Sequence, residues 1–167
     1  MTVEDGTGLV NADSYVDIAF ADAYLASMGV TAWQSLQPAK KEVLLVKATD
    51  YVDNTYRWRG RKLTQEQALQ FPREGLVDND GNDVTGIPRA LKQAVCMAAS
   101  VLITEDSLYA VEESNGAVVS ERIGQLAFTY DVSKKVKGSS LYDSINLRLR
   151  GLYEKSGGIL YGDIEKR

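Results

Sequence analysis

The feature that most constrains the fold is the segment from Ile87 to Ile103, "IPRALKQAVCMAASVLI". Its apolar residues fall on two neighbouring stripes of a helix, because they recur every three or four positions. A helix that is apolar on two adjacent faces is typical of the centre of a bundle, and its alanines let other helices approach closely. We therefore predict a central helix near residues 88–105. The two stripes are Leu91, Val95, Ala98 and Leu102, and Cys96, Ala99 and Ile103.

Three further helices are predicted around this centre, near residues 18–28, 38–54 and 140–154. Asp17 and Ser140 can cap the first and the third. Pro38 fits the first turn of the second, because its missing N–H would be unpaired there. Thr64 followed by Gln67 predicts a short additional helix, which Pro72 ends. The residues expected to face inward are Ile18, Ala21, Leu25 and Met28; Leu44, Leu45, Ala48, Tyr51 and Val52; and Leu141, Ile145, Leu149 and Leu152.

Two stretches favour β-structure. "LVDNDGNDV" is typical of a hairpin that turns at Asp80-Gly81. Residues 117–130, "AVVSERIGQLAFTY", are rich in β-branched and aromatic residues that partly alternate. The predicted fold is therefore mainly α, a small helical bundle with a β-hairpin and an extended C-terminal tail.

The chain shows no repeat and no proline-rich linker, so we expect one domain. That domain spans residues 1–156 and includes a short N-terminal arm, residues 1–13, which are rich in turn formers. Gly157-Gly158 then begin a flexible tail, residues 157–167, because glycine bends at little cost.

Composition narrows the chemistry. The chain has no histidine and one cysteine, which removes the commonest acid–base group at neutral pH and the commonest metal ligand. "DNDGND" places three aspartates around Gly81, but no acidic residue follows at the spacing that a calcium loop needs. We expect no catalytic site, no bound metal and no cofactor.

The charge and the N-terminus bear on partners. A formal net charge of −4 argues against phosphate binding over the whole surface. The N-terminus, "MTVEDGTG", is acidic, and no apolar run has the length that crosses a bilayer. We therefore expect neither a signal peptide nor a membrane anchor.

One local cluster runs against the acidic balance. "YRWRGRK" places Arg57, Arg59, Arg61 and Lys62 around Trp58. One interpretation is structural: positive charge favours a helix C-terminus, and Trp58 would be a half-buried lid. The other is functional: the five residues contact DNA or an acidic surface on a partner, since aromatic and basic residues together suit single-stranded DNA. The sequence leaves both interpretations open.

Several segments, in their serial order, resemble a phage family. They are "GTGLVNADSYVDIAFADAYLASMG", "ATDYVDNTYRWRGRK", "QALQFPR", "DNDG", "IPRALKQAVCMAAS" and "SERIGQLAFTY", and they cover roughly residues 5–130. Together they are similar to proteins of tailed bacteriophages that are labelled DnaT-like single-stranded-DNA-binding proteins. Such proteins also resemble head–tail connector adaptors, which are small, mostly helical subunits.

The resemblance implies a structural virion protein at the head–tail junction, assembled in the host cytoplasm. It would form a homo-oligomeric, dodecameric ring that binds the portal protein and tail or further connector proteins. Its contact with the double-stranded DNA that passes through would be weak. A single basic cluster in an acidic chain favours this adaptor role, because a conduit should not grip DNA. The alternative is a DnaT-like single-stranded-DNA-binding protein, which needs a continuous basic groove and several stacking aromatics.

The C-terminal tail is the expected portal-docking segment. Its sequence, "ILYGDIEKR", places aliphatic and aromatic residues beyond the last predicted helix, and exposed apolar clusters tend to mark contact sites. Deleting residues 157–167 should leave the fold intact and abolish portal attachment. The residues expected to dock are Ile159, Leu160, Tyr161 and Ile164.

Overall fold

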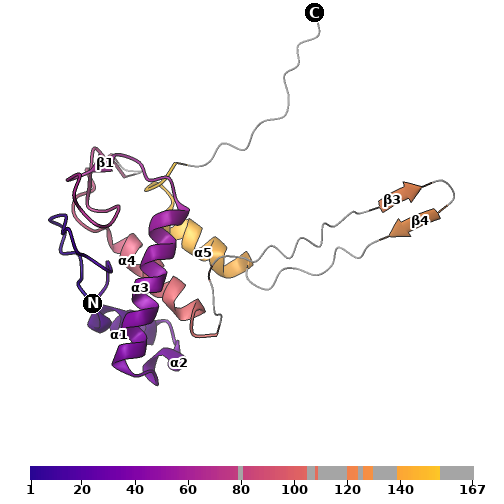
Figure 1. Ribbon diagram of the computed structural model, residues 1–167, viewed down its shortest axis with the longest axis horizontal. Coiled ribbons are helices and arrows are strands. Elements are labelled where there is room, and N and C mark those ends of the chain that lie inside the picture. The colour runs from indigo at the N-terminus through magenta and orange to yellow at the C-terminus, as the bar shows by residue number, and fades with distance from the viewer. Residues whose placement is uncertain (79–80, 105–107, 109–119, 124–125, 130–138, 155–167) are drawn as a thin grey trace, which may run out of the picture.

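The computed structural model describes residues 1–78, 81–104, 108, 120–123, 126–129 and 139–154. Five helices form the framework of these residues, which confirms the mainly α prediction (Figure 1). Four of them match the predicted helices, and α2 was not predicted because its four residues are too few to show a periodic pattern. The helices are α1 (Ile18–Ser27), α2 (Thr31–Gln34), α3 (Pro38–Thr55), α4 (Arg89–Val101) and α5 (Ser139–Leu149). No helix in the described part of the chain is both long and apolar enough to cross a membrane.

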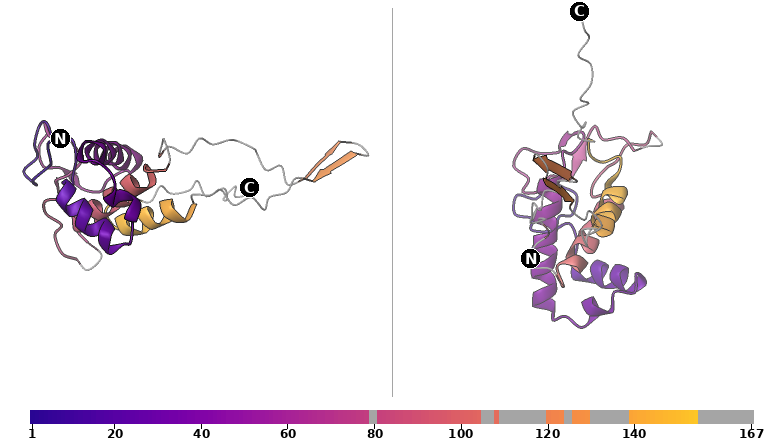
Figure 2. Two further views of the ribbon diagram at one scale, coloured as in Figure 1. Left: turned by 90° about the horizontal axis from the view of Figure 1, so that it is seen from below. Right: turned by 90° about the vertical axis from the view of Figure 1, so that its right-hand side faces the viewer.

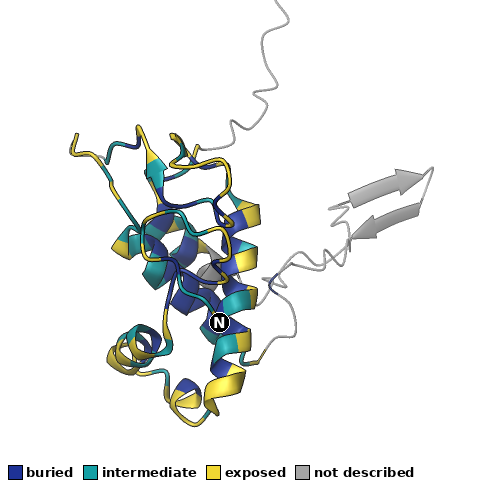
Figure 3. Cartoon of the chain, turned by 60° about the vertical axis from the view of Figure 1, so that its left-hand side comes forward, coloured by how far each residue is buried: buried dark blue, intermediate teal, exposed yellow. Residues whose placement is uncertain are grey.

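Helix α4 is the centre of the bundle, as its two apolar stripes predict. It packs against α1, α3 and α5, and it lies between α3 and α5 in the right-hand view of Figure 2. Leu91, Val95, Cys96 and Ala98 are fully buried. Dark blue buried residues accordingly concentrate where the helices face one another (Figure 3).

Helix α5 ends earlier than predicted, at Leu149 rather than near residue 154. Gly151 has a φ of 100°, in the left-handed region that glycine tolerates after a last helical turn. The backbone N–H of Leu152 donates to the carbonyl of Leu149 at 2.9 Å and closes this turn. Residues 152–154 therefore do not continue the helix, and their backbone groups can pair with another segment.

Two antiparallel strand pairs are present in the described residues. β1 (Arg61–Lys62) pairs with β2 (Arg73–Glu74). β3 (Ser120–Ile123) pairs with β4 (Leu126–Thr129), which confirms the strand pattern predicted in 117–130. Around the predicted turn at Gly81, Val77 pairs with Asp83 in a single antiparallel bridge.

The short helix predicted after Thr64 is absent, and that prediction is wrong. The side chain of Gln67 does accept the backbone N–H of Thr64 at 2.9 Å, as a capping box would. Its amide, however, donates to the carbonyls of Leu69 and Pro72. Carbonyls held in this way cannot continue a helical ladder, so the segment folds as a loop around one buried glutamine.

The N-terminal arm is also more ordered than predicted. Glu4 is 2% exposed, and its carboxylate accepts the backbone N–H groups of Gly6, Gly8 and Leu9 at 3.0, 2.9 and 2.8 Å. The Glu4 N–H donates to the carbonyl of Ser14 at 2.8 Å. The arm is thus a loop closed on a buried carboxylate.

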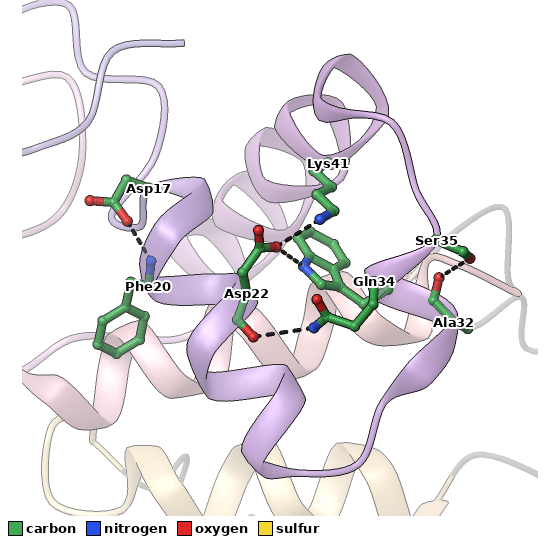
Figure 4. Close-up of polar contacts among 8 residues, drawn as sticks. Asp17, Phe20, Asp22, Ala32, Gln34, Ser35 and Lys41 are labelled. Atoms are coloured by element: carbon green, nitrogen blue, oxygen red, sulfur yellow. Dashed lines mark hydrogen bonds and ion pairs between the residues drawn. The ribbon is translucent and has the colours of Figure 1, made fainter.

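A polar cluster ties α2 to α1 and α3 (Figure 4). The carboxylate of Asp22 accepts the indole N–H of Trp33 at 2.7 Å and lies 2.8 Å from the ammonium of Lys41. Lys41 also lies over the Trp33 ring, 5.7 Å from its centroid. A buried lysine needs such a partner, because an unpaired buried charge is costly.

Candidate nucleic-acid interface

The predicted basic cluster lies on a chain segment that pairs with the end of α5. The Arg59 N–H donates to the Leu152 carbonyl at 3.0 Å, and the Glu154 N–H donates to the Arg57 carbonyl at 2.8 Å. An antiparallel bridge joins Trp58 to Tyr153 between these two bonds. Two segments more than ninety residues apart in the sequence thereby lie side by side.

The extended backbone of residues 57–59 places successive side chains on opposite faces. Neighbouring residues of an extended chain point to opposite faces, and here Trp58 points into the core while Arg57 and Arg59 are exposed. Arg150, which is also exposed, precedes the paired segment and forms a bridge with Tyr153, the residue opposite Trp58. We call Arg57, Arg59 and Arg150 the arginine face.

Trp58 belongs to the core, as the structural interpretation of the basic cluster requires of a covered ring. It is 6% exposed, and its indole N–H donates to the Asp53 carbonyl at 3.2 Å. Its ring meets Phe71 edge to face, with centroids 5.0 Å apart. A ring covered in this way cannot stack on a base, so the structural interpretation holds for Trp58.

Two exposed arginines of the cluster, Arg57 and Arg61, each have a carboxylate partner. The Nε of Arg57 lies 2.8 Å from Glu154, and that of Arg61 lies 2.8 Å from Glu74. Their side chains are 85% and 80% exposed. Exposed pairs of this kind contribute little to stability, so both guanidinium groups can exchange a carboxylate for another anion.

The other predicted cations have different surroundings. Arg59 donates from Nη1 to the Gly151 carbonyl at 2.9 Å, a contact that leaves its charge uncompensated. Lys62 is half-buried, with its Nζ 3.4 Å from the Gln67 carbonyl. Within the described part of the chain, Arg150 has no ion pair. Arg59 and Arg150 are therefore the exposed arginines of this surface that have no carboxylate partner among the described residues.

Arg73 holds the loop that presents Arg59. Its Nε and Nη2 donate to the carbonyls of Arg59 and Gly60, both at 2.7 Å, and its Nη1 donates to the Gln70 carbonyl at 3.1 Å. Gly60 has a φ of 72°, and a Cβ there would lie 2.5 Å from the Glu74 carbonyl oxygen. The turn therefore requires glycine, and Arg73 fixes its carbonyls.

A buried hydrogen-bond network holds the same loop against the core. Tyr15 donates its hydroxyl to the carboxylate of Asp53 and accepts the Phe71 N–H at 3.0 Å. The other Asp53 oxygen accepts the Gln70 N–H at 2.9 Å. Burial raises the pKa of Asp53 to about 6, although the hydrogen bond from Tyr15 opposes the rise. This network connects α3 to the loop before β2.

Sequence reasoning missed two residues at this surface, Arg150 and Tyr153. The Tyr153 ring lies 4.8 Å from that of Tyr56, whose hydroxyl donates to the Asn146 side-chain oxygen at 2.6 Å. A hollow of about 440 Å³ opens beside them. No local pattern marks these residues, because the end of α5 reaches the basic segment only through long-range pairing. The hollow is lined by Asp143, Asn146, Leu147, Arg150 and Tyr153.

Other candidate chemistry is limited. Burial raises the pKa of Cys96 to about 12, so its thiol is not a nucleophile at neutral pH. In the described ranges, no group of three or more acidic or cysteine residues could hold a metal ion. The predicted portal-docking residues Ile159, Leu160, Tyr161 and Ile164 lie outside the described residues.

Comparison with known proteins gives one match. A family model described as "Putative DnaT-like ssDNA binding protein" matches residues 1–166. Neither the curated proteins nor the solved structures contain a significant match to the chain.

Proposed function

The chain belongs to this DnaT-like family, and we propose that it binds single-stranded DNA through the arginine face. The observation that supports the proposal most strongly is the pairing of residues 57–59 with residues 152–154. This pairing brings the segment of the exposed Arg57 and Arg59 next to the segment that follows the exposed Arg150. The family is described by binding rather than by catalysis, and the proposal includes no catalytic step.

The arginines suit phosphate. A guanidinium offers five N–H donors in a planar fork that matches phosphate oxygens. Arg59 uses one of its groups on a neutral carbonyl, and Arg57 pairs with an exposed carboxylate that water screens. Because the protein as a whole is acidic, contact is confined to this face and weakens with salt.

Fluorescence anisotropy tests the proposal. Labelled single-stranded and duplex oligonucleotides of one sequence are titrated with the wild type and with the double variant Arg59→Gln/Arg150→Gln. We expect the wild type to prefer the single strand at low salt and the double variant to lose most of that binding. Lys40→Gln is the matched control, because Lys40 is exposed near the opposite end of α3 and about 25 Å of helix separates the two ends. Undiminished binding by the double variant would refute the proposal.

A second candidate function is the head–tail connector adaptor. The burial of Trp58 and the carboxylates beside Arg57 and Arg61 favour it, because they reduce the grip on DNA. In this role the protein would form a ring in the virion between the portal protein and tail proteins, and would touch passing duplex DNA only weakly.

Electron microscopy of the protein mixed with its portal tests this second candidate. The adaptor role predicts a ring of subunits docked on the portal, together with weak and equal binding of single-stranded and duplex oligonucleotides. A protein that stays monomeric beside the portal and prefers the single strand would contradict it.

A further inference from the structure

The hollow next to the arginine face has the chemistry of a nucleobase site. It is an open hollow of about 440 Å³ rather than an enclosed pocket, so a base that is still joined to its strand can enter it. We propose that this hollow, which we call the base hollow, receives one unpaired base of the bound strand. The inference rests on the proposed single-stranded-DNA binding. It assigns a nucleobase to the hollow, whereas the arginine face accounts only for the phosphates.

The base hollow is built on a rigid element. Asp143, Asn146 and Leu147 are spaced three and four residues apart, so they form one stripe along α5, and Arg150 follows directly after the helix. The opposite stripe includes Ile145 and is fully buried in the core. Side chains on a packed helix keep their positions better than side chains on a free loop, so the hollow is present before a ligand arrives.

One wall of the hollow is aromatic. Tyr153 is half-buried and packs on Tyr56, which in turn packs on Trp58 with ring centroids 5.4 Å apart. The hydrogen bond from the Tyr56 hydroxyl to Asn146 fixes this stack against α5. A tyrosine ring held on one side can accept a base on the other, and such stacking tolerates any base.

The remaining wall offers both donors and acceptors. The side-chain oxygen of Asn146 is occupied by Tyr56, which leaves the amide N–H groups as donors. Asp143 adds an exposed carboxylate acceptor. Exposed Leu147 supplies an apolar surface between them. This combination suits the edge and face of a nucleobase.

Arg150 links the base hollow to the arginine face. It lines the hollow and is exposed, so it can contact the phosphate attached to a base that sits inside. Bases of a duplex are stacked and paired, and reach such a site only after they are unpaired. The base hollow therefore gives a physical reason for preferring a single strand, which the arginines alone do not.

The test compares three probes of equal length: a thymidine oligonucleotide, the same sugar–phosphate backbone without bases, and a duplex. Anisotropy should show the thymidine strand binding about tenfold more tightly than the abasic strand, as stacking of a base on an aromatic ring provides. Tyr153→Leu should lower thymidine-strand affinity to the abasic level without changing abasic binding. Tyr153→Phe, which keeps the ring, should bind like the wild type.

A second variant guards against misfolding of Tyr153→Leu. Leu147→Trp places a second ring at the hollow from a position that is 67% exposed and outside the core, so it should change thymidine binding and leave abasic binding unaltered. Equal affinity of the wild type for thymidine and abasic strands would overturn the base hollow and leave the arginine face standing. Wild-type affinity in Leu147→Trp would overturn it as well. If neither strand binds, the proposed function fails and the base hollow fails with it.

Discussion

Replacing Tyr15 by phenylalanine removes one oxygen from the centre of the molecule. Tyr15 is fully buried, and its hydroxyl serves two partners at once. It donates to the Asp53 carboxylate and accepts the Phe71 N–H at 3.0 Å. Phenylalanine fits the same space, and the edge-to-face contact with Phe71 remains possible. The variant therefore isolates the hydrogen bonds from the packing.

The expected cost follows from those two bonds. A hydrogen bond to a charged group contributes about 1.5–3 kcal/mol, and a buried N–H left without an acceptor costs about 1–3 kcal/mol. The two effects share one oxygen and need not add fully, so we expect about 3 kcal/mol. In a domain of this size that lowers Tm by roughly 6–12 °C.

Urea unfolding followed by tryptophan fluorescence measures this cost. Tyr24→Phe is the matched control, because the Tyr24 hydroxyl is buried and has no hydrogen-bond partner among the described residues. Its removal should not lower the free energy of unfolding, because no hydrogen bond is lost. A Tyr15→Phe variant as stable as the Tyr24→Phe control would show that the buried network does not stabilise the loop before β2.

Three further predictions concern stability. The folded pKa of Asp53, about 6, lies above that of an unfolded aspartate, so the folded state binds more protons between pH 5 and 7. The free energy of unfolding should therefore rise by about 1 kcal/mol from pH 7 to pH 5 in the wild type and not in Asp53→Asn. Urea unfolding at each pH measures this change, and an equal change in both proteins would contradict the prediction. Glu4→Ala leaves three backbone N–H groups without their acceptor, so limited proteolysis should cut residues 5–9 faster, and an unchanged rate would show that the carboxylate does not hold the arm. Gly60→Ala should lower the free energy of unfolding by about 1–3 kcal/mol, because its Cβ meets the Glu74 carbonyl at a φ of 72°, and an unchanged urea midpoint would rule out this clash.

The helices were predictable because their causes are local. Two apolar stripes predict α4, Pro38 and its following periodicity predict α3, and Asp17 caps α1 by accepting the Phe20 N–H at 2.6 Å. The end of α5 was predicted too late, since Gly151 stops the helix without a proline or a second glycine beside it. The short helix after Thr64 was predicted wrongly, because the Gln67 side chain takes carbonyls that a helix would need.

The interface was predictable only in part. Exposure of Arg57, Arg59 and Arg61 follows from their charge, and the sequence identifies them as a cluster. The burial of Trp58 depends on Phe71 and Asp53, and the contribution of Arg150 and Tyr153 depends on pairing between residues 57–59 and 152–154. Contacts across such sequence distances leave no periodic signal, so the sequence could not decide between the two interpretations of Trp58.

Photo-crosslinking tests most directly whether this surface binds single-stranded DNA. A strand containing bromodeoxyuridine is irradiated with the protein at low salt, and the attached peptides are identified by mass spectrometry. We predict adducts within residues 56–61 and 143–154, which contain the arginine face and the base hollow, and their loss in Arg59→Gln/Arg150→Gln. Adducts confined to α1 and α2, or adducts that persist unchanged in the double variant, would contradict the assignment of this surface.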